Sequence, residues 1–299
     1  MKKSFLISLS LFLIVLTSCA PSQPKVKHVF LIGLDGMSSY AFRTAEMPNA
    51  KTMMEQGSYT TLKRSVLPSS SAINWATMFM GAPEEVHGFT TWGSKTPEIP
   101  SRILNQHGIY PTIFQLYRDK NPDARIDVLY DWDGIKYLVD TLSLDYFAGS
   151  GNYDPEILRD MAIKDIKENQ PNLMAIIFDN PDHVGHSIGW ETEEYQSMLT
   201  REDACLGEII KAIDEAGIRD ESVIILTADH GGIGQGHGSI TLNEMETPFI
   251  ITGPGIKKNF CFDDWSMMQY DCAGTMARIL DVQLPQPSPG RSVDVIFEP

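Results

Sequence analysis

Three long apolar runs dominate the pattern of hydrophobic and polar positions along the chain. They read HVFLIGLDG from His28, NLMAIIFDNPDHVGH from Asn172 and SVIILTADHGG from Ser222, and they are rich in β-branched residues. Continuous apolar runs of this kind are typical of strands buried on both faces of a parallel sheet. Shorter strand-like runs occupy residues 60–66, 124–130 and 247–253. The pattern therefore predicts a largely parallel central sheet.

Helical patterns separate these runs. Residues 154–169 and 192–217 have the spacing of amphipathic helices. The stretch LPSSSAINWATMFMG, residues 67–81, has three serines near its start and continues as an apolar helix. Alternation of strands and helices predicts an α/β fold, here a three-layer helix–sheet–helix sandwich. A chain of 299 residues can build this as one large domain, which we place at residues 28–299.

The first residues have a different character. MKKSFLISLSLFLIVLTSCA begins with two lysines, continues as an apolar stretch and ends in Leu-Thr-Ser-Cys. This pattern predicts a signal peptide at residues 1–18, and its ending resembles a bacterial lipobox, with cleavage before Cys19 and lipidation of that cysteine. Residues 19–27 then form the lipidated cysteine and a linker. The alternatives are a simple signal peptide or a membrane-anchoring helix.

A lipid at Cys19 would tether the protein to a membrane without spanning it. We therefore expect an exported bacterial lipoprotein, on the periplasmic or outer-membrane face. Two other cysteines, Cys261 and Cys272, could pair in an oxidising compartment or remain buried thiols, and their spacing does not decide between the two.

The chain is strongly acidic. Its formal net charge is −15, and loss of the leader leaves 22 basic against 39 acidic residues, a net charge of −17. Such a chain is a poor candidate for binding a nucleic-acid duplex. An anionic substrate would also be repelled unless bound cations reverse the local charge.

Candidate ligands for such cations follow the long runs. Each run ends in aspartate, and ligands of open α/β sheets bind beyond the carboxyl ends of the strands. Carboxylates mixed with imidazoles suit zinc better than magnesium or calcium. The candidates outnumber the ligands of one tetrahedral ion, which predicts two ions and displacement at phosphorus. They are Asp35, Asp182, His186, Asp229, His230 and His237.

The order of the motifs resembles the alkaline phosphatase superfamily, and within it the type I phosphodiesterase/nucleotide pyrophosphatase branch. The motifs are GLDG, a serine before an asparagine and an apolar helix, DHVGH, ADHGG, a downstream HG and the closing PQPSPGRSVDVIF. The resemblance spans His28 to the end of the chain. It implies that Asp35, Asp229 and His230 hold one zinc ion and that Asp182, His186 and His237 hold the other. Other divalent metals are the alternative.

The resemblance also implies a serine nucleophile that contacts a metal ion. A helix N-terminus favours both an alkoxide and an incoming anion, and the run after the three serines offers one. The family register, set through Gly81–Gly88, places Ser71 on the nucleophile and Asn74 on a family asparagine, for which we expect substrate binding. Ser70 is the alternative nucleophile. His87 matches a structural histidine of the family.

The chain departs from the family pattern beside the nucleophile. Ala72-Ile73 replaces Phe-Pro, and Trp92 stands where many members carry an asparagine that binds a phosphate oxygen. Trp92 and Trp190 could form an aromatic wall for the substrate, with core packing as the alternative. Lys63, Lys95 and backbone amides near Ala72 are candidate transition-state donors.

The resemblance implies a two-zinc hydrolase of phosphodiester or nucleotide pyrophosphate bonds that forms a covalent seryl intermediate on a small anionic phosphate ester. A phosphomonoesterase with the same site is the alternative. A sulfatase of this superfamily needs a C/S-x-P-x-R setting, which residues 71–75 do not supply. A non-catalytic surface-binding lipoprotein is the remaining alternative.

Overall fold

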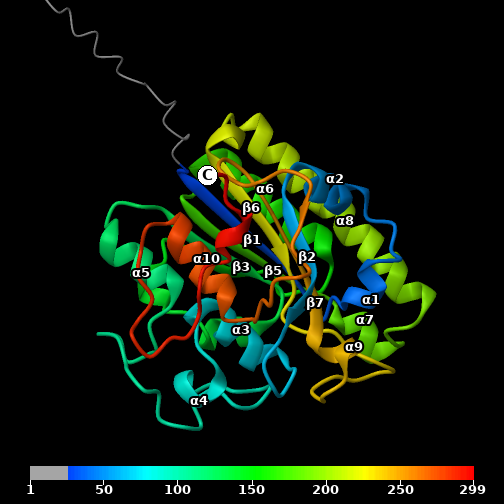
Figure 1. Cartoon of the computed structure of the whole chain (residues 1–299), viewed down its shortest axis with the longest axis horizontal. Helices are drawn as coiled ribbons and strands as arrows, with labels where there is room; N and C mark the ends of the chain where they lie inside the picture. Colours follow the sequence, from blue (N-terminus) through cyan, green and yellow to red (C-terminus); the bar gives the residue numbers. More distant parts are fainter. Residues whose placement is uncertain (1–25) are drawn as a thin grey trace, which may run out of the picture.

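The computed structural model describes residues 26–299, so the predicted signal peptide and Cys19 lie outside the described residues. Its centre is one eight-stranded sheet with the order β4-β3-β5-β1-β6-β7-β2-β8 (Figure 1). The strands are β1 (His28–Asp35), β2 (Ser58–Arg64), β3 (Ile126–Tyr130), β4 (Tyr146–Gly149), β5 (Leu173–Pro181), β6 (Ser222–Thr227), β7 (Glu246–Thr252) and β8 (Phe260–Cys261).

Helices cover both faces of this sheet, which confirms the predicted three-layer α/β architecture (Figure 1). The α-helices are α1 (Ser39–Phe42), α2 (Pro48–Gln56), α3 (Ser71–Met80), α4 (Glu84–His87), α5 (Ile113–Lys120), α6 (Pro155–Asn169), α7 (Asp182–Ser187), α8 (Glu193–Glu215), α9 (Leu242–Met245) and α10 (Asp271–Ile279). Short 3-10 turns occupy Asp133–Tyr137, Thr141–Ser143, Arg219–Glu221 and Asp294–Ile296.

Strand β1 shows why its sequence is apolar throughout. Val29 and Leu31 belong to the core beneath α3, α5 and α10, whereas Phe30, Ile32 and Leu34 belong to the core beneath α2, α6 and α8. Successive side chains of a strand point to opposite faces, so a strand covered by helices on both sides needs apolar residues at every position. The continuous apolar pattern is the consequence of burial on both faces.

The three long apolar runs become neighbouring parallel strands. Strand β1 pairs in parallel with β5 on one side and with β6 on the other. Strand β7 is antiparallel to both β6 and β2, so the sheet is largely but not wholly parallel. Because β5, β1 and β6 run in the same direction, the aspartates at their carboxyl ends lie at one edge of the sheet.

Two glycines permit close packing beside that edge. A Cβ atom on Gly33 would lie 2.3 Å from the Trp75 ring, and one on Gly232 would lie 2.2 Å from the Trp190 ring. Real Cβ contacts are not that short, so either substitution would displace an indole ring from below the strand ends. The two glycines therefore position large side chains beneath the candidate site.

The three cysteines within residues 26–299 do not form a bridge. Cys205, Cys261 and Cys272 are all free, with Cys261 exposed on β8 and Cys272 buried in α10. Within residues 26–299, none of the helices has the length and apolar character needed to cross a membrane.

Candidate metal centre

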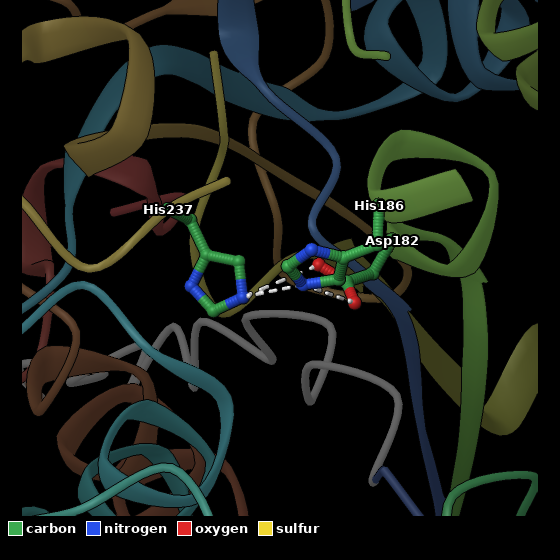
Figure 2. A group of neighbouring side chains, drawn as sticks. All are labelled: Asp182, His186 and His237. Atoms are coloured by element: carbon green, nitrogen blue, oxygen red, sulfur yellow. Dashed lines mark hydrogen bonds and ion pairs between the residues drawn. The ribbon is translucent and has the colours of Figure 1, made fainter. Parts of the chain in front are cut away.

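The first group of metal-binding side chains comes from α7 and from the loop after β6. Asp182 and His186 lie one helical turn apart on α7, and His237 reaches toward them from the loop (Figure 2). The Nε2 atoms of His186 and His237 are 3.0 Å apart. His186 Nε2 lies 3.4 Å from Asp182 Oδ2, and His237 Nε2 lies 3.6 Å from Asp182 Oδ1. We call Asp182, His186 and His237 the outer group because the His186 side chain is 47% exposed.

The second group is buried at the ends of β1 and β6. His230 Nε2 lies 3.4 Å from Asp35 Oδ1 and 3.3 Å from Asp229 Oδ2. We call Asp35, Asp229 and His230 the inner group, and both side chains from the Asp229–His230 pair are 0% exposed. Ligand atoms of Asp35, Asp182 and His230 also lie within 4.8 Å of one another. Asp182 is therefore close to both groups, whereas the sequence-based assignment gave it to one ion alone.

The three histidines present the same nitrogen to the site. Each Nδ1 atom lies near a backbone carbonyl oxygen. Nδ1 of His230 is 2.8 Å from the oxygen of Gly231. Nδ1 of His186 is 3.0 Å from that of Gln235, and Nδ1 of His237 is 2.9 Å from that of Ser69. A carbonyl oxygen only accepts hydrogen bonds, so each Nδ1 carries the proton and donates it. Each Nε2 is then a free lone pair directed at the cluster, which is the arrangement found in metal-binding histidines.

Burial keeps the imidazoles of His230 and His237 neutral. Loss of solvent lowers the pKa of His230 to about 3, and burial together with the nearby His230 lowers the pKa of His237 to about 3. A neutral imidazole is the form that binds a metal ion. The chemistry of the donors is therefore suited to a cation.

The carboxylates are crowded and incompletely bonded. Burial, followed by the charges of neighbouring aspartates, raises the pKa of Asp35 and Asp182 well above the ordinary range. Burial also raises the pKa of Asp229 to about 6 and of Asp179 to about 7. Asp182 Oδ1 and Asp229 Oδ2 are buried and lack a hydrogen-bond partner in the described part of the chain. Crowded carboxylates without donors are stabilised by a cation.

Ser71 lies beside the inner group. It is the first residue of α3, and its Oγ is 3.0 Å from His230 Nε2 and 3.3 Å from Asp35 Oδ1. Ser70 is the residue that precedes the helix, and the Ser69 hydroxyl donates to the Ser239 carbonyl at 2.8 Å. Of the three serines, Ser71 is the one whose hydroxyl contacts the cluster.

The hydrogen bonds of Asn74 and the exposure of Trp92 could not be read from the sequence. The Asn74 side chain is buried, accepts from the Val66 N–H at 2.8 Å and donates to the carbonyls of Val66, Pro68 and Ser70. These bonds hold the loop that leads into α3. Trp92 is 68% exposed on a turn, and no described contact joins it to either metal-ligand group.

The other candidate contacts are engaged elsewhere. Lys63 is 0% exposed, and its ammonium donates to the Ala228 carbonyl at 2.7 Å and to the Gln269 side chain. Burial lowers the pKa of Lys63 to about 8. Lys95 lies over the Tyr137 ring. Trp190 is fully buried and donates from Nε1 to the Gly36 carbonyl at 3.0 Å, so it packs beneath the site, in agreement with the core-packing alternative.

Trp75 is a site residue that the sequence reasoning missed. Its Nε1 donates to Asp35 Oδ2 at 2.8 Å, opposite the oxygen that faces Ser71. Residues four apart on a helix share a face, so the spacing from Ser71 to Trp75 was the available signal. The bond fixes the orientation of the Asp35 carboxylate.

The remaining histidines have structural partners. His87 accepts from the Phe89 N–H at Nδ1 and lies 3.0 Å from the Thr77 hydroxyl, and burial lowers its pKa to about 3. His28 bonds the Pro171 carbonyl, His107 bonds Asp140, and His183 stacks on Tyr153. The structural reading of His87 agrees with these contacts.

The fold and these side chains define a class: an alkaline phosphatase-like α/β protein with a candidate metal centre at the carboxyl ends of its central strands. Solved structures support the fold. Murine ectonucleotide pyrophosphatase/phosphodiesterase 5, in an inactive form with AMP, matches with a TM-score of 0.72 and 14% identity, over 91% of this chain and 100% of that one. A 2-O GAG sulfatase matches with a TM-score of 0.70 and 14% identity, over 91% of this chain and 73% of that one.

The family model described as type I phosphodiesterase/nucleotide pyrophosphatase matches residues 29–247. The chain therefore belongs to this family, within the alkaline phosphatase superfamily. The venom phosphodiesterase of Macrovipera lebetinus is 21% identical over 252 residues, 71% of this chain and 26% of that protein. The bis(5'-adenosyl)-triphosphatase enpp4 of Mus musculus is 21% identical over 227 residues, which are 70% of this chain and 48% of that protein. The chain thus spans less than half the length of these two relatives.

Proposed function

We propose that the protein is a two-zinc phosphoric ester hydrolase that cleaves phosphodiester or nucleotide pyrophosphate bonds through a covalent intermediate on Ser71. The observation that carries the proposal is the common orientation of three imidazoles. His186, His230 and His237 each donate Nδ1–H to a backbone carbonyl and direct Nε2 into one carboxylate-rich cluster. Imidazole lone pairs and carboxylate oxygens that face one another in this way are stabilised by a bound cation.

The spacing of the donors fits zinc. Bonds of about 2.0–2.2 Å in a tetrahedral site separate neighbouring ligand atoms by roughly 3.3–3.6 Å. The donor pairs of the outer group are 3.0, 3.4 and 3.6 Å apart. The corresponding separations around the inner group range from 3.0 to 3.4 Å. They join His230 to Asp35 and Asp229, and they join Ser71 to His230 and Asp35.

We assign one ion to the inner group and Ser71, and the other to the outer group. When bound, the two ions would lower the pKa of the serine hydroxyl, neutralise the phosphate oxygens and stabilise the leaving oxygen. Asp182 is close enough to both groups to orient both ions. Trp75 and the three backbone carbonyls keep the ligands in place.

The residues of the chain then divide the reaction into two displacements. Ser71 Oγ would release its proton to solvent and attack phosphorus; the Oγ–P bond forms, the bond to the leaving oxygen breaks, and that oxygen takes up a proton from solvent. Water then attacks the seryl phosphate, the Oγ–P bond breaks, and Ser71 regains a proton. Ser71 is the first residue of α3, and the N–H groups of a helix's first turn have no partner within the helix, so their partial positive charge would favour the anionic transition state.

The charges of the site favour a diester over a monoester. Lys63 is a buried basic side chain whose charge acts on the cluster, through Asp229 and His230. The ammonium of the nearby Lys63 is committed to Ala228 and Gln269. A dianionic monoester gains most from an additional cationic side chain, whereas a diester carries a single charge. The names of the phosphodiesterase and triphosphatase relatives agree with this preference.

One substrate comparison tests the proposal. The purified protein is given 4-nitrophenyl phosphate, bis(4-nitrophenyl) phosphate and a dinucleoside polyphosphate under identical conditions with zinc. We expect the diester or the polyphosphate to be hydrolysed with the higher kcat/KM. A strong preference for the monoester would favour the phosphomonoesterase alternative, and no turnover of any of them would favour a non-catalytic binding protein. Turnover of a sulfate ester alone would favour a sulfatase.

We also propose that the protein is an exported lipoprotein tethered through Cys19. The support is the sequence of residues 1–19, with two lysines, an apolar stretch and a lipobox-like ending. Mass spectrometry of the membrane-extracted protein tests this, with a diacylated or triacylated Cys19 as the expected N-terminal residue. An unmodified N-terminus beyond Cys19 would contradict it.

A further inference from the structure

The chain enters the fold at the end of the sheet that lies opposite the candidate metal centre. The Lys27 N–H donates to the Glu221 carbonyl at 2.9 Å, and the Lys27 carbonyl accepts from the Asn172 side chain at 3.1 Å. These partners directly precede β6 and β5. Lys27 is therefore held at the amino ends of the central strands, and β1 begins at the next residue.

The candidate metal centre lies at the other end of the same strands. Asp35 is the last residue of β1, Asp182 follows β5, and Asp229 follows β6 by two residues. At about 3.3 Å per residue, the seven steps from His28 to Asp35 span about 23 Å. In Figure 1 the blue β1 crosses the middle of the molecule between these two ends.

The surface around the metal centre faces away from the entry point. His186 is half exposed, and Ile240 is 75% exposed on the loop that follows His237. This loop is joined to the nucleophile segment because Ser69 donates its hydroxyl hydrogen to the Ser239 carbonyl. We call His186 and Ile240 the site rim.

From these positions we infer that the tether holds the site rim away from the membrane that carries it, and that the substrates are phosphodiesters dissolved in the aqueous phase rather than lipids of that membrane. The inference rests on the proposed function and on lipidation at Cys19. It adds a substrate class that neither proposal contains.

Chain length makes the argument quantitative. The eight residue steps from Cys19 to Lys27 extend to at most about 28 Å. A compact domain of this size has a diameter of roughly 48 Å. If Lys27 is at most about 28 Å above the membrane and the domain is a sphere that rests on it, the point diametrically opposite Lys27 stays about 20 Å or more above the membrane. Asp35, about 23 Å along β1 from the entry, lies toward that side. A lipid phosphate in the same membrane lies beyond the reach of Ser71.

A quenching experiment tests the orientation without using activity. The exposed Cys261 is first replaced by serine, and one fluorophore is attached in the lipidated protein through Ile240→Cys or, as the matched control near the entry end, Lys258→Cys. The protein is inserted into vesicles with a short-range quencher on the lipid headgroups. We expect the label at position 258 to be quenched at least about fivefold more than the label at position 240. Equal quenching, or stronger quenching at position 240, would overturn the inference.

A kinetic experiment tests the substrate class. A nitrophenyl phosphodiester linked to a lipid is placed in the vesicle that carries the protein, and soluble bis(4-nitrophenyl) phosphate is the control. We expect soluble ester turnover and less than about a tenth of that rate on the lipid-linked ester, restored when the same ester is dispersed in detergent. Insertion of thirty Gly/Ser residues between Pro24 and Lys25 should raise the rate on the vesicle-bound ester.

The two failures are distinguishable. Rapid hydrolysis of the vesicle-bound ester by the protein with the native linker would overturn the inference while the proposed function stands. Absence of turnover on the soluble ester would contradict the proposed function, and the quenching ratio would still decide the orientation.

Discussion

The inner and outer groups have similar ligands in very different surroundings. Asp35, Asp229 and His230 are almost completely buried at strand ends, whereas His186 of the outer group is half exposed on the short helix α7. Buried carboxylates are costly unless a cation or proton compensates them, and the inner group has two of them, Asp35 and Asp229, whereas the outer group has one, Asp182. The comparison indicates that the inner group depends on its ion for stability, and that the outer group gives the substrate access.

Removal of the Ser71 hydroxyl should have the largest effect on activity. We expect Ser71→Ala to lower kcat by about 10³-fold or more, because the seryl intermediate can no longer form. Ser70→Ala is the matched control and should retain most of the activity. Metal content should be unchanged in both variants, measured by elemental analysis. Full activity in Ser71→Ala would remove this serine from the mechanism.

Substitution of one histidine in each group separates the two environments. His230→Ala leaves Asp35 and Asp229 buried without their ligand partner, and we expect it to lower the free energy of unfolding by about 3–5 kcal/mol. His186→Ala removes a half-exposed ring and one bond to a carbonyl, for an expected loss of about 1 kcal/mol. Urea unfolding with zinc present measures both. Equal losses would contradict the difference between the groups.

Removal of the metal should also distinguish the outer group from the inner group. The outer group has a half-exposed ligand, His186, whereas the inner group has none, so we expect a chelator to remove the outer ion first and the inner ion more slowly. Activity should fall with the first ion and the melting temperature chiefly with the second. Timed chelation followed by elemental analysis and thermal unfolding checks this. Loss of both ions in one kinetic phase would count against two distinct environments.

The bond from Trp75 to Asp35 should have the smallest effect. Trp75→Phe keeps most of the ring in the core but removes the Nε1–H donor, and loss of such a supporting bond typically costs about 10- to 100-fold in metal affinity or activity. Phe79→Leu, one turn later on α3 and packed on Trp75, is the control for packing. We expect Phe79→Leu to lower stability while metal affinity stays the same. A metal titration in which the two variants respond equally would assign Trp75 a packing role.

Much of the fold could be predicted because its cause is local. The runs at His28, Asn172 and Ser222 are apolar at every position because both faces of β1, β5 and β6 are covered. Their final aspartates meet because parallel strands end at one edge. The pattern did not predict β4 and β8, which have four and two residues, because such short edge strands carry little periodicity.

The finer parts of the site could not be predicted because their partners are distant in sequence or belong to the backbone. The carbonyl that orients His237 belongs to Ser69, 168 residues earlier, and any residue type could supply it. Lys63 looked available for catalysis, but its pairing with Ala228 and Gln269, both more than 160 residues away in the sequence, appears only in the folded chain. The bond between the Asn74 amide and the loop before α3 likewise appears only in the folded chain, and the expected role of Asn74 at the substrate stays a prediction.

The number of bound ions tests the central claim most directly. The purified mature protein, and its His186→Ala and His230→Ala variants, are dialysed against trace zinc and analysed for metal per chain. The account predicts two zinc ions in the natural protein and about one in His186→Ala, held by the buried inner group. A protein that hydrolyses phosphodiesters without bound metal, or that loses both ions when His186 is replaced, would contradict it.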